Sequence, residues 1–149
     1  KWFADAVPPH TDAVGPHHPL AAAANTAVTT VLKSMPSLGF KPAAEAVLQL
    51  AIAANGHLND TAPWSRMKQP GQEAEVGDDL YAVLEATRIV GLLLSSLLPD
   101  LSNRILEQLG TSSDPDGWTE QLSWGGLVSG ASLPKPSPVM QRLELEESL

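Results

Sequence analysis

The residues with the clearest chemical potential lie close together near the middle of the chain. Trp64 is followed by Arg66 and Lys68, so a large flat ring stands beside the closest pair of basic residues in an acidic chain. An indole can stack on a nucleobase for about 1–3 kcal/mol, and basic side chains can contact phosphates. The pattern therefore makes stacking on a nucleobase one hypothesis. On the residues alone the stronger interpretation is that Trp64 is a packing residue, as tryptophans commonly are.

Two neighbours bear on how Trp64 is presented. Pro63 forbids further α-turns and pushes Ala62 towards an extended conformation, so Trp64 is expected at a sharp exit from a helix, on stiffened backbone. Asn55 can either satisfy a helix end or read a ligand, and its residue type leaves both roles open.

No catalytic or metal-binding residue is predicted. His57 is expected to be a partly exposed helix-end residue, because no orienting carboxylate is marked beside it. His10, His17 and His18 lie in an irregular segment with no carboxylate at a ligand spacing nearby. The serines lack a nucleophile elbow, and no glycine-rich loop follows a strand.

The elements that must position these residues are helices. Apolar residues recur at i, i+3 and i+4 in four stretches, which predicts helices over about 19–35, 42–60, 79–97 and 101–109. Asp78 and Asp79 are candidate caps of the third helix, and Gly110 reads as the residue that ends the fourth. Arg88 is expected to pair with Glu85 one turn away.

The remaining sequence is turn-rich. We predict an irregular docking segment over 111–144, in which Val139, Met140 and Leu143 pack back onto the helices, and an acidic tail over 145–149. The short loops favour antiparallel packing. The predicted fold class is therefore all-α, an antiparallel helix bundle with an irregular C-terminal extension, as one domain over 1–149.

Composition agrees with this class and limits the partners. The chain has 149 residues, 43% of them hydrophobic and only 5% aromatic, and alanine and leucine supply most of the apolar content. A net charge of −8 argues against an autonomous, non-specific nucleic-acid binder. There is no cysteine, and the longest apolar run, 89–98, is too short to span a bilayer, so no membrane partner is expected. Because the chain opens on Lys1 with Trp2 and Phe3 at once, we expect it to be a piece of a longer protein.

Several stretches, in order along nearly the whole chain, resemble methionyl-tRNA synthetases. The segment 54–64, ANGHLNDTAPW, looks like the family segment that ends in Pro-Trp. The stretch 80–90 and then Leu94, Ser95 and Pro99 resemble the next long helix, and 105–110 the short helix after it. The Trp-Gly-Gly-Leu at 124–127, Gly130 and 138–144 are similar to the closing segment. The loop lengths look most like those of cyanobacterial and plant organellar members.

The resemblance implies the helical anticodon-binding domain of a class I synthetase, with the anticodon loop of tRNA(Met) and the catalytic domain of the same protein as partners. Trp64 would stack on an anticodon base and Pro63 would set its angle. Asn55 would brace the helix end, and Arg66 and Lys68 would contact phosphates. The family's other anticodon-reading residues, an asparagine and an arginine, would lie on a helix preceding Lys1.

The parent enzyme would attach methionine to tRNA using ATP, in the cytoplasm or, for a plant or algal organellar form, in the chloroplast or mitochondrion. These 149 residues are expected to be inactive and to hold no cofactor. ATP with Mg, and Zn as a further candidate, would belong to the catalytic part. Two alternatives stay open: the matching domain of a sister synthetase for valine, isoleucine, leucine or cysteine, and a helical adaptor that binds proteins through an apolar groove and buries Trp64.

Overall fold

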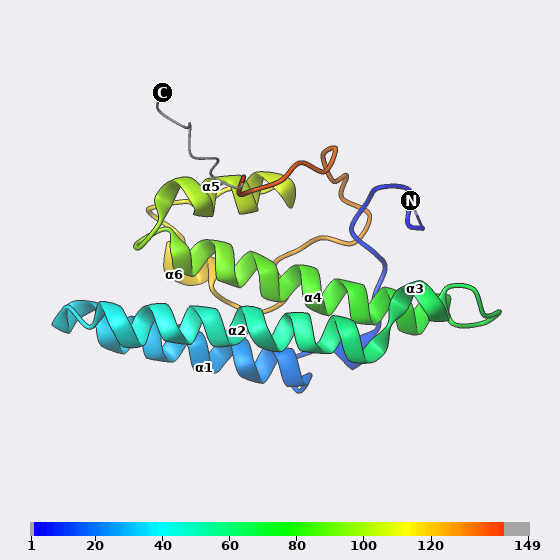
Figure 1. Ribbon diagram of the computed structural model, residues 1–149, viewed down its shortest axis with the longest axis horizontal. Helices are drawn as coiled ribbons and strands as arrows, with labels where there is room; N and C mark the ends of the chain where they lie inside the picture. Colours follow the sequence, from blue (N-terminus) through cyan, green and yellow to red (C-terminus); the bar gives the residue numbers. More distant parts are fainter. Residues whose placement is uncertain (1, 142–149) are drawn as a thin grey trace, which may run out of the picture.

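The computed structural model describes residues 2–141, and three long helices form its body. These are α1 (Pro19–Ser34), α2 (Phe40–Thr61) and α4 (Glu73–Leu94), which lie side by side, with α5 (Pro99–Gln108) packed on α4 (Figure 1). The shorter elements are η1 (Asp12–Val14), η2 (Met35–Ser37), α3 (Pro63–Arg66) and α6 (Trp118–Gln121). Residues 2–141 contain one isolated β-bridge and no strand, which confirms the all-α bundle. Within the same range, no helix combines the length and apolarity needed to cross a membrane.

Helices α1 and α2 pack closely because small residues line their contact. α1 begins at Pro19, where the missing N–H needs no partner, and the ring of His18 accepts a hydrogen bond from the Leu20 amide at 3.1 Å. The buried residues of the two helices are Leu20, Ala21, Ala24, Ala27, Val31, Ala43, Val47, Leu50 and Ala54. The bounds of α1 lie close to the expected 19–35, and those of α2 close to the expected 42–60.

Helix α4 begins at Glu73 rather than at the expected position 79. Asp78 and Asp79 are therefore inside the helix, and the prediction that they cap it is wrong. Gly77 is buried where a Cβ would lie 2.7 Å from the Pro9 carbonyl oxygen. The glycine is needed for this close approach of the N-terminal segment to α4. Asp78 accepts hydrogen bonds from the Thr11 amide at 2.6 Å and hydroxyl at 2.7 Å.

Helix α5 is held against α4 at another glycine. A Cβ on Gly91 would lie 2.9 Å from a methyl group of Leu106, and the buried Ser102 hydroxyl donates to the Gly91 carbonyl at 2.7 Å. α5 ends at Gln108, and Gly110 follows with a φ of 67°, in the left-handed region. The Gly110 and Thr111 amides close the end by donating to earlier carbonyls of α5, as predicted for a C-terminal glycine.

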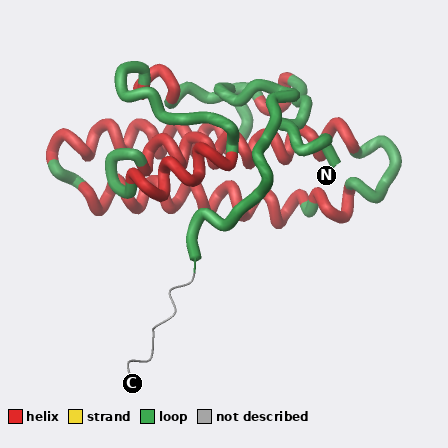
Figure 2. The backbone as a smooth tube through the Cα atoms, turned by 90° about the horizontal axis from the view of Figure 1, so that it is seen from above, coloured by secondary structure: helices red, strands yellow, loops and turns green. Residues whose placement is uncertain are grey.

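After α5 the chain returns across α4 and meets the N-terminal segment (Figure 2). The Trp118 indole donates to the Leu92 carbonyl at 2.9 Å and the Trp124 indole to that of Val14 at 2.8 Å. This return contains α6, which the sequence reading missed, and is irregular elsewhere. Met140 lines a shallow hollow beside Leu97 and Arg104 although it is 68% exposed, and Val139 is half-buried. Leu143 and the tail 145–149 lie outside the described residues.

Candidate nucleic-acid interface

Trp64 stands on a single-turn helix directly after α2. Ala62 has φ 41° and ψ 58°, so it is left-handed, and the extended conformation expected for it is wrong. Its amide ends α2 by donating to the Leu58 carbonyl at 3.2 Å, and its carbonyl starts α3 by accepting from the Ser65 amide at 2.9 Å. Ala62 alone thus links α2 to α3, and its two hydrogen bonds require a left-handed rather than an extended backbone.

The two residues after this turn point in opposite directions. Pro63 occupies the first position of α3, where a proline loses no hydrogen bond, and its side chain is fully buried. Trp64 follows and is 46% exposed. A buried proline and an exposed indole therefore share one helical turn, and the indole has an open face at the rim of the bundle.

Arg66, the last residue of α3, is bound by carboxylates. Its Nη1 donates to Asp79 Oδ2, its Nη2 donates to Glu75 Oε2 at 2.5 Å, and its Nε donates to Gln72 Oε1 at 3.2 Å. All three partners lie at the start of α4 or just before it. The guanidinium charge is therefore compensated within the protein, which is not the arrangement expected of a free phosphate-binding arginine.

Asp79 also has a partner on α2. His57 Nε2 lies 3.1 Å from Asp79 Oδ1, so the prediction that no carboxylate stands beside His57 is wrong. The His18 ring meets His57 edge-on with centroids 5.2 Å apart. Burial lowers the pKa of His18, and the nearby His57 lowers it further. The His57 and His18 rings thus connect Asp79 of α4 to the start of α1.

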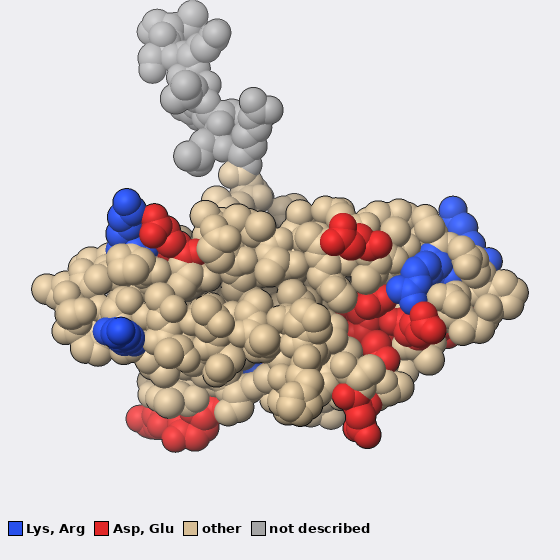
Figure 3. All heavy atoms as spheres, turned by 90° about the horizontal axis from the view of Figure 1, so that it is seen from below, with Lys and Arg blue, Asp and Glu red and all other residues tan. Residues whose placement is uncertain are grey.

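Asn55 and Lys68 are both exposed, and neither side chain makes a hydrogen bond or ion pair within residues 2–141. The expected bracing of the helix end by Asn55 is therefore not seen. Basic and acidic side chains stand together at this end of the molecule, the end that carries α3 in Figure 1, as the space-filling view shows (Figure 3). Lys68 is the basic side chain of this rim that is left for a ligand.

The described residues hold no group of three or more histidines and acidic side chains arranged for a metal ion. The sequence reading missed Asp79 as a member of the rim because its partners lie far along the chain. Arg66 is thirteen positions before it and His57 twenty-two, with the α3 turn and a loop between. The helical periodicity of the sequence does not predict contacts between positions this far apart. Gln72 was missed for the same reason.

The fold is that of a domain of an aminoacyl-tRNA synthetase. The structure of Mycobacterium tuberculosis methionyl-tRNA synthetase in its free state aligns with 98% of this chain and 29% of its own, with a TM-score of 0.84 and 25% identity. The structure of the same organism's enzyme with methionyl-adenylate aligns with 95% of this chain, with a TM-score of 0.81 and 26% identity.

Sequence comparisons define the family further. Residues 7–148 match the family described as the anticodon binding domain of methionyl tRNA ligase, and the chain belongs to this family. The methionine–tRNA ligase of Synechocystis is 37% identical over 142 residues, covering 89% of this chain and 26% of the relative. The chloroplastic/mitochondrial methionine–tRNA ligase of Arabidopsis thaliana is 39% identical over 113 residues, covering 73% of this chain and 18% of the relative.

The resemblance to methionyl-tRNA synthetases is thus confirmed, including the likeness to cyanobacterial and plant organellar members. The family match decides against the sister synthetases for valine, isoleucine, leucine and cysteine, and against a protein-binding adaptor. The chain spans about a quarter or less of the length of these two relatives.

Proposed function

We propose that this domain recognises the anticodon of tRNA(Met) within a methionine–tRNA ligase, and that Trp64 stacks on an anticodon base. The observation that carries the proposal is the exposed Trp64 indole, 46% accessible, on a one-turn helix whose first residue, Pro63, is buried. Unpaired loop bases are commonly recognised by stacking on aromatic side chains while their edges are read by polar groups.

The neighbouring residues have different parts in this proposal. Pro63 sets the direction of α3 and hence of the indole. Lys68, exposed and unpaired, contacts a backbone phosphate, which positions the RNA without reading its sequence. Asn55, also exposed and unpaired, offers an amide to a base or to the sugar-phosphate backbone. Arg66 holds α3 rather than the RNA, because its guanidinium already donates to Asp79 and Glu75.

In our proposal the domain has two partners, tRNA(Met) and the catalytic domain of the same protein, and the reaction takes place in the catalytic domain. There, ATP activates methionine, with Mg and also Zn as the expected metal ions. The enzyme would act in the cytoplasm or, as a plant or algal organellar form, in the chloroplast or mitochondrion, the compartments in the name of the Arabidopsis relative.

The test is Trp64→Ala in the full-length ligase. Loss of one base–aromatic stack of about 1–3 kcal/mol should reduce kcat/KM for tRNA(Met) roughly 5- to 150-fold. Methionine-dependent ATP–pyrophosphate exchange, which does not involve tRNA, should stay unchanged. Phe40→Ala is the matched control, because Phe40, 52% exposed, is an aromatic residue at the opposite end of α2. An equal fall in exchange and in tRNA charging would show that Trp64 is a structural residue.

A further inference from the structure

Asp79 joins three helices beneath the Trp64 rim. Asp79 belongs to α4. Its Oδ2 accepts a hydrogen bond from Arg66 of α3, and its Oδ1 lies 3.1 Å from His57 Nε2 of α2. The Asp79 side chain is only 15% exposed. One partly buried carboxylate of α4 thus contacts both α3, which carries Trp64, and α2, which precedes it.

We propose that Asp79 is a positioning residue for anticodon binding: acting through Arg66, it fixes α3 and so the plane of the Trp64 indole. This inference rests on the proposed function. Asp79 and Arg66 do not contact RNA in this proposal. They fix the orientation of the Trp64 indole before RNA binds.

The shortness of α3 is the first reason that a brace is needed. Four residues form too short a helix to be stable alone, since nucleation is unfavourable and each turn must be held by tertiary contacts. α3 is joined to α2 by Ala62 alone and to α4 by a loop containing Gly71 at φ 81°. Pro63 anchors one end of α3 by burial. Arg66 is the side chain that anchors the other end.

The chemistry of Arg66 makes it suited to this task. A planar guanidinium has five donors in a fixed fork, and here three of its nitrogens donate to three different side chains. Several contacts in different directions define an orientation, whereas a lysine at the same place would supply a single point charge. The rigid fork therefore transmits the position of α4 to α3.

The two carboxylates on Arg66 are not equivalent. The Glu75 side chain is 67% exposed and that of Asp79 is 15% exposed. Water and salt screen the Glu75 pair strongly, so it contributes little, whereas the Asp79 pair is shielded. Removing either carboxylate changes the net charge by the same amount. Glu75→Gln is therefore a control for Asp79→Asn that shares both the charge change and the arginine partner.

Positioning and simple electrostatics predict opposite results for Asp79→Asn. Removing an acidic side chain makes the rim more positive and frees the Arg66 guanidinium, which by charge alone would strengthen binding to an anionic RNA. If Asp79 positions Trp64, the same substitution weakens binding. The sign of the change thus separates the two explanations.

The experiment uses the full-length ligase with Asp79→Asn, Glu75→Gln, Trp64→Ala and the double variant Trp64→Ala/Asp79→Asn. We expect Asp79→Asn to raise the KM for tRNA(Met) several-fold with little change in kcat or in ATP–pyrophosphate exchange. Glu75→Gln should leave this KM unchanged or lower it. In the Trp64→Ala background Asp79→Asn should add nothing, because residues that act as one unit are non-additive. A KM increase of the same size in both backgrounds would overturn the inference.

A spectroscopic measurement keeps the brace separate from the proposed function. In protein labelled with 5-fluorotryptophan, the Trp64 fluorine resonance, assigned by its loss in Trp64→Phe, should shift or broaden in Asp79→Asn and not in Glu75→Gln. If Trp64→Ala leaves the KM for tRNA unchanged, the proposed function fails, and the resonance alone then decides. A Trp64 resonance that is identical in wild type and Asp79→Asn overturns the brace. Should Asp79→Asn not fold, Arg66→Lys, which keeps the charge but loses the fork, must give the same KM and resonance changes.

Discussion

Glu85 and Arg88 form a buried ion pair within a single turn of α4. Arg88 Nη2 lies 2.5 Å from Glu85 Oε1, and Arg88 Nε lies 2.9 Å from Oε2. The i, i+3 spacing predicted this pair, and the structure confirms it and buries both side chains. Such a pair stabilises a fold only when its remaining hydrogen-bonding groups also find partners.

Those partners come from the returning chain at 121–127. The Glu85 carboxylate accepts hydrogen bonds from the Gly125, Gly126 and Leu127 amides at 2.8, 2.9 and 3.1 Å. Arg88 donates to the carbonyls of Gln121 and Ser123 at 2.6 and 2.7 Å. The backbone of the returning chain therefore satisfies the polar groups of this pair and fastens the C-terminal segment to α4.

The first prediction is that Glu85→Gln is strongly destabilising. It leaves the Arg88 charge buried without its counter-ion, and breaking a buried pair in this way costs about 3–5 kcal/mol. Urea denaturation should show a lower midpoint with little change in slope. Glu107→Gln, an exposed change on α5, serves as the control and should lie within about 0.5 kcal/mol of wild type. A Glu85→Gln protein as stable as the control contradicts the role given to this pair.

The second prediction contrasts two glycines inside helices. Gly77→Ala places a Cβ 2.7 Å from the Pro9 carbonyl, a backbone atom that cannot rotate away, and overpacking of this kind costs about 1–3 kcal/mol. Gly56→Ala has no neighbour within 4 Å and should stabilise α2 by about 0.5–1 kcal/mol. Thermal unfolding of the two variants should move in opposite directions. Equal shifts would mean that Gly77 is not a packing position.

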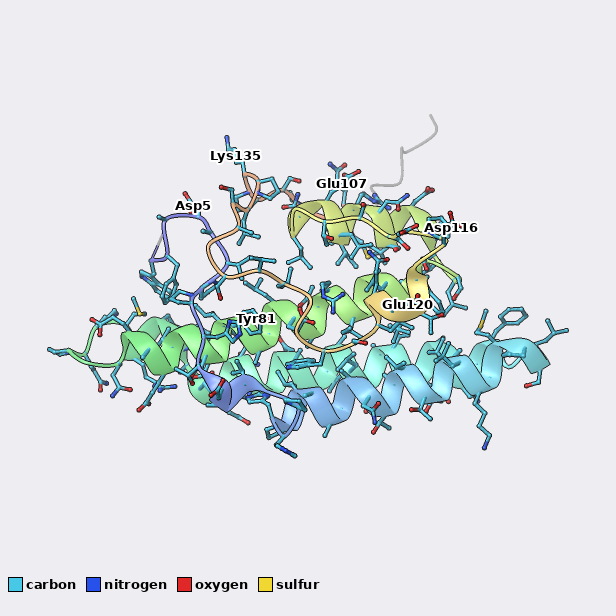
Figure 4. All side chains as sticks on the ribbon, turned by 180° about the vertical axis from the view of Figure 1, so that it is seen from behind. Asp5, Tyr81, Glu107, Asp116, Glu120 and Lys135 are labelled. Carbon is cyan, nitrogen blue, oxygen red and sulfur yellow. The ribbon has the colours of Figure 1, made fainter. Side chains whose placement is uncertain are left out.

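The third prediction concerns Tyr81, the single tyrosine of the sequence. Figure 4 shows it on the side of α4 that the terminal segments cover, and its hydroxyl donates to the Leu127 carbonyl at 3.0 Å. Burial, and after it the nearby Glu85 charge, raise the pKa of Tyr81 to about 12. In the unfolded chain the Tyr81 phenol has a pKa near 10. The stability that the neutral phenol contributes is therefore complete below pH 10 and is lost as the pH rises towards about 12.

Near-ultraviolet absorbance of tyrosinate in this domain measures the titration directly, because no other tyrosine contributes. Tyr81→Phe removes the ionisable group. The variant should therefore lose less stability than wild type between about pH 10 and 12. A Tyr81 that titrates near pH 10 in the folded protein would contradict its buried, hydrogen-bonded position.

The fourth prediction tests the seat of α5 on α4. Ser102 is fully buried and donates to the Gly91 carbonyl at 2.7 Å, so Ser102→Ala should cost about 1 kcal/mol. Ser96, an exposed serine whose hydroxyl also donates to a helix carbonyl, at 3.3 Å, is the control. Ser96→Ala should change the free energy of unfolding by less than about 0.5 kcal/mol. Indistinguishable variants would argue against the Ser102 contact.

How far the sequence predicts this structure depends on the range of the contacts. α1 and α2 follow from apolar residues that repeat within one helix. The start of α4 does not, because Gly77 looks like a helix breaker until the Pro9 carbonyl that requires it is known. The sequence left the exposure of Trp64 open and predicted an extended Ala62, whereas the structure has an exposed indole after a left-handed Ala62.

Contacts between distant positions account for what the sequence did not show at the rim. Arg66 was predicted to contact phosphate because it stands beside Trp64 and Lys68 in the segment that resembles the family. The carboxylates that compensate it come from α4, after a loop whose path no local pattern defines. Asp79 was read as a helix cap for the same reason.

The segments before α1 and after α6 hold each other. The Val7 amide donates to the Ala131 carbonyl at 2.9 Å, the Gly130 amide donates back to Val7 at 2.9 Å, and the Leu133 amide donates to the Asp5 carbonyl at 2.8 Å. Because this pairing is antiparallel, both segments leave it at the Asp5–Leu133 end. Mechanical force applied through the two flanks would therefore open the Asp5–Leu133 bond first and the Val7 bonds after it, peeling the segments apart from the outside inward.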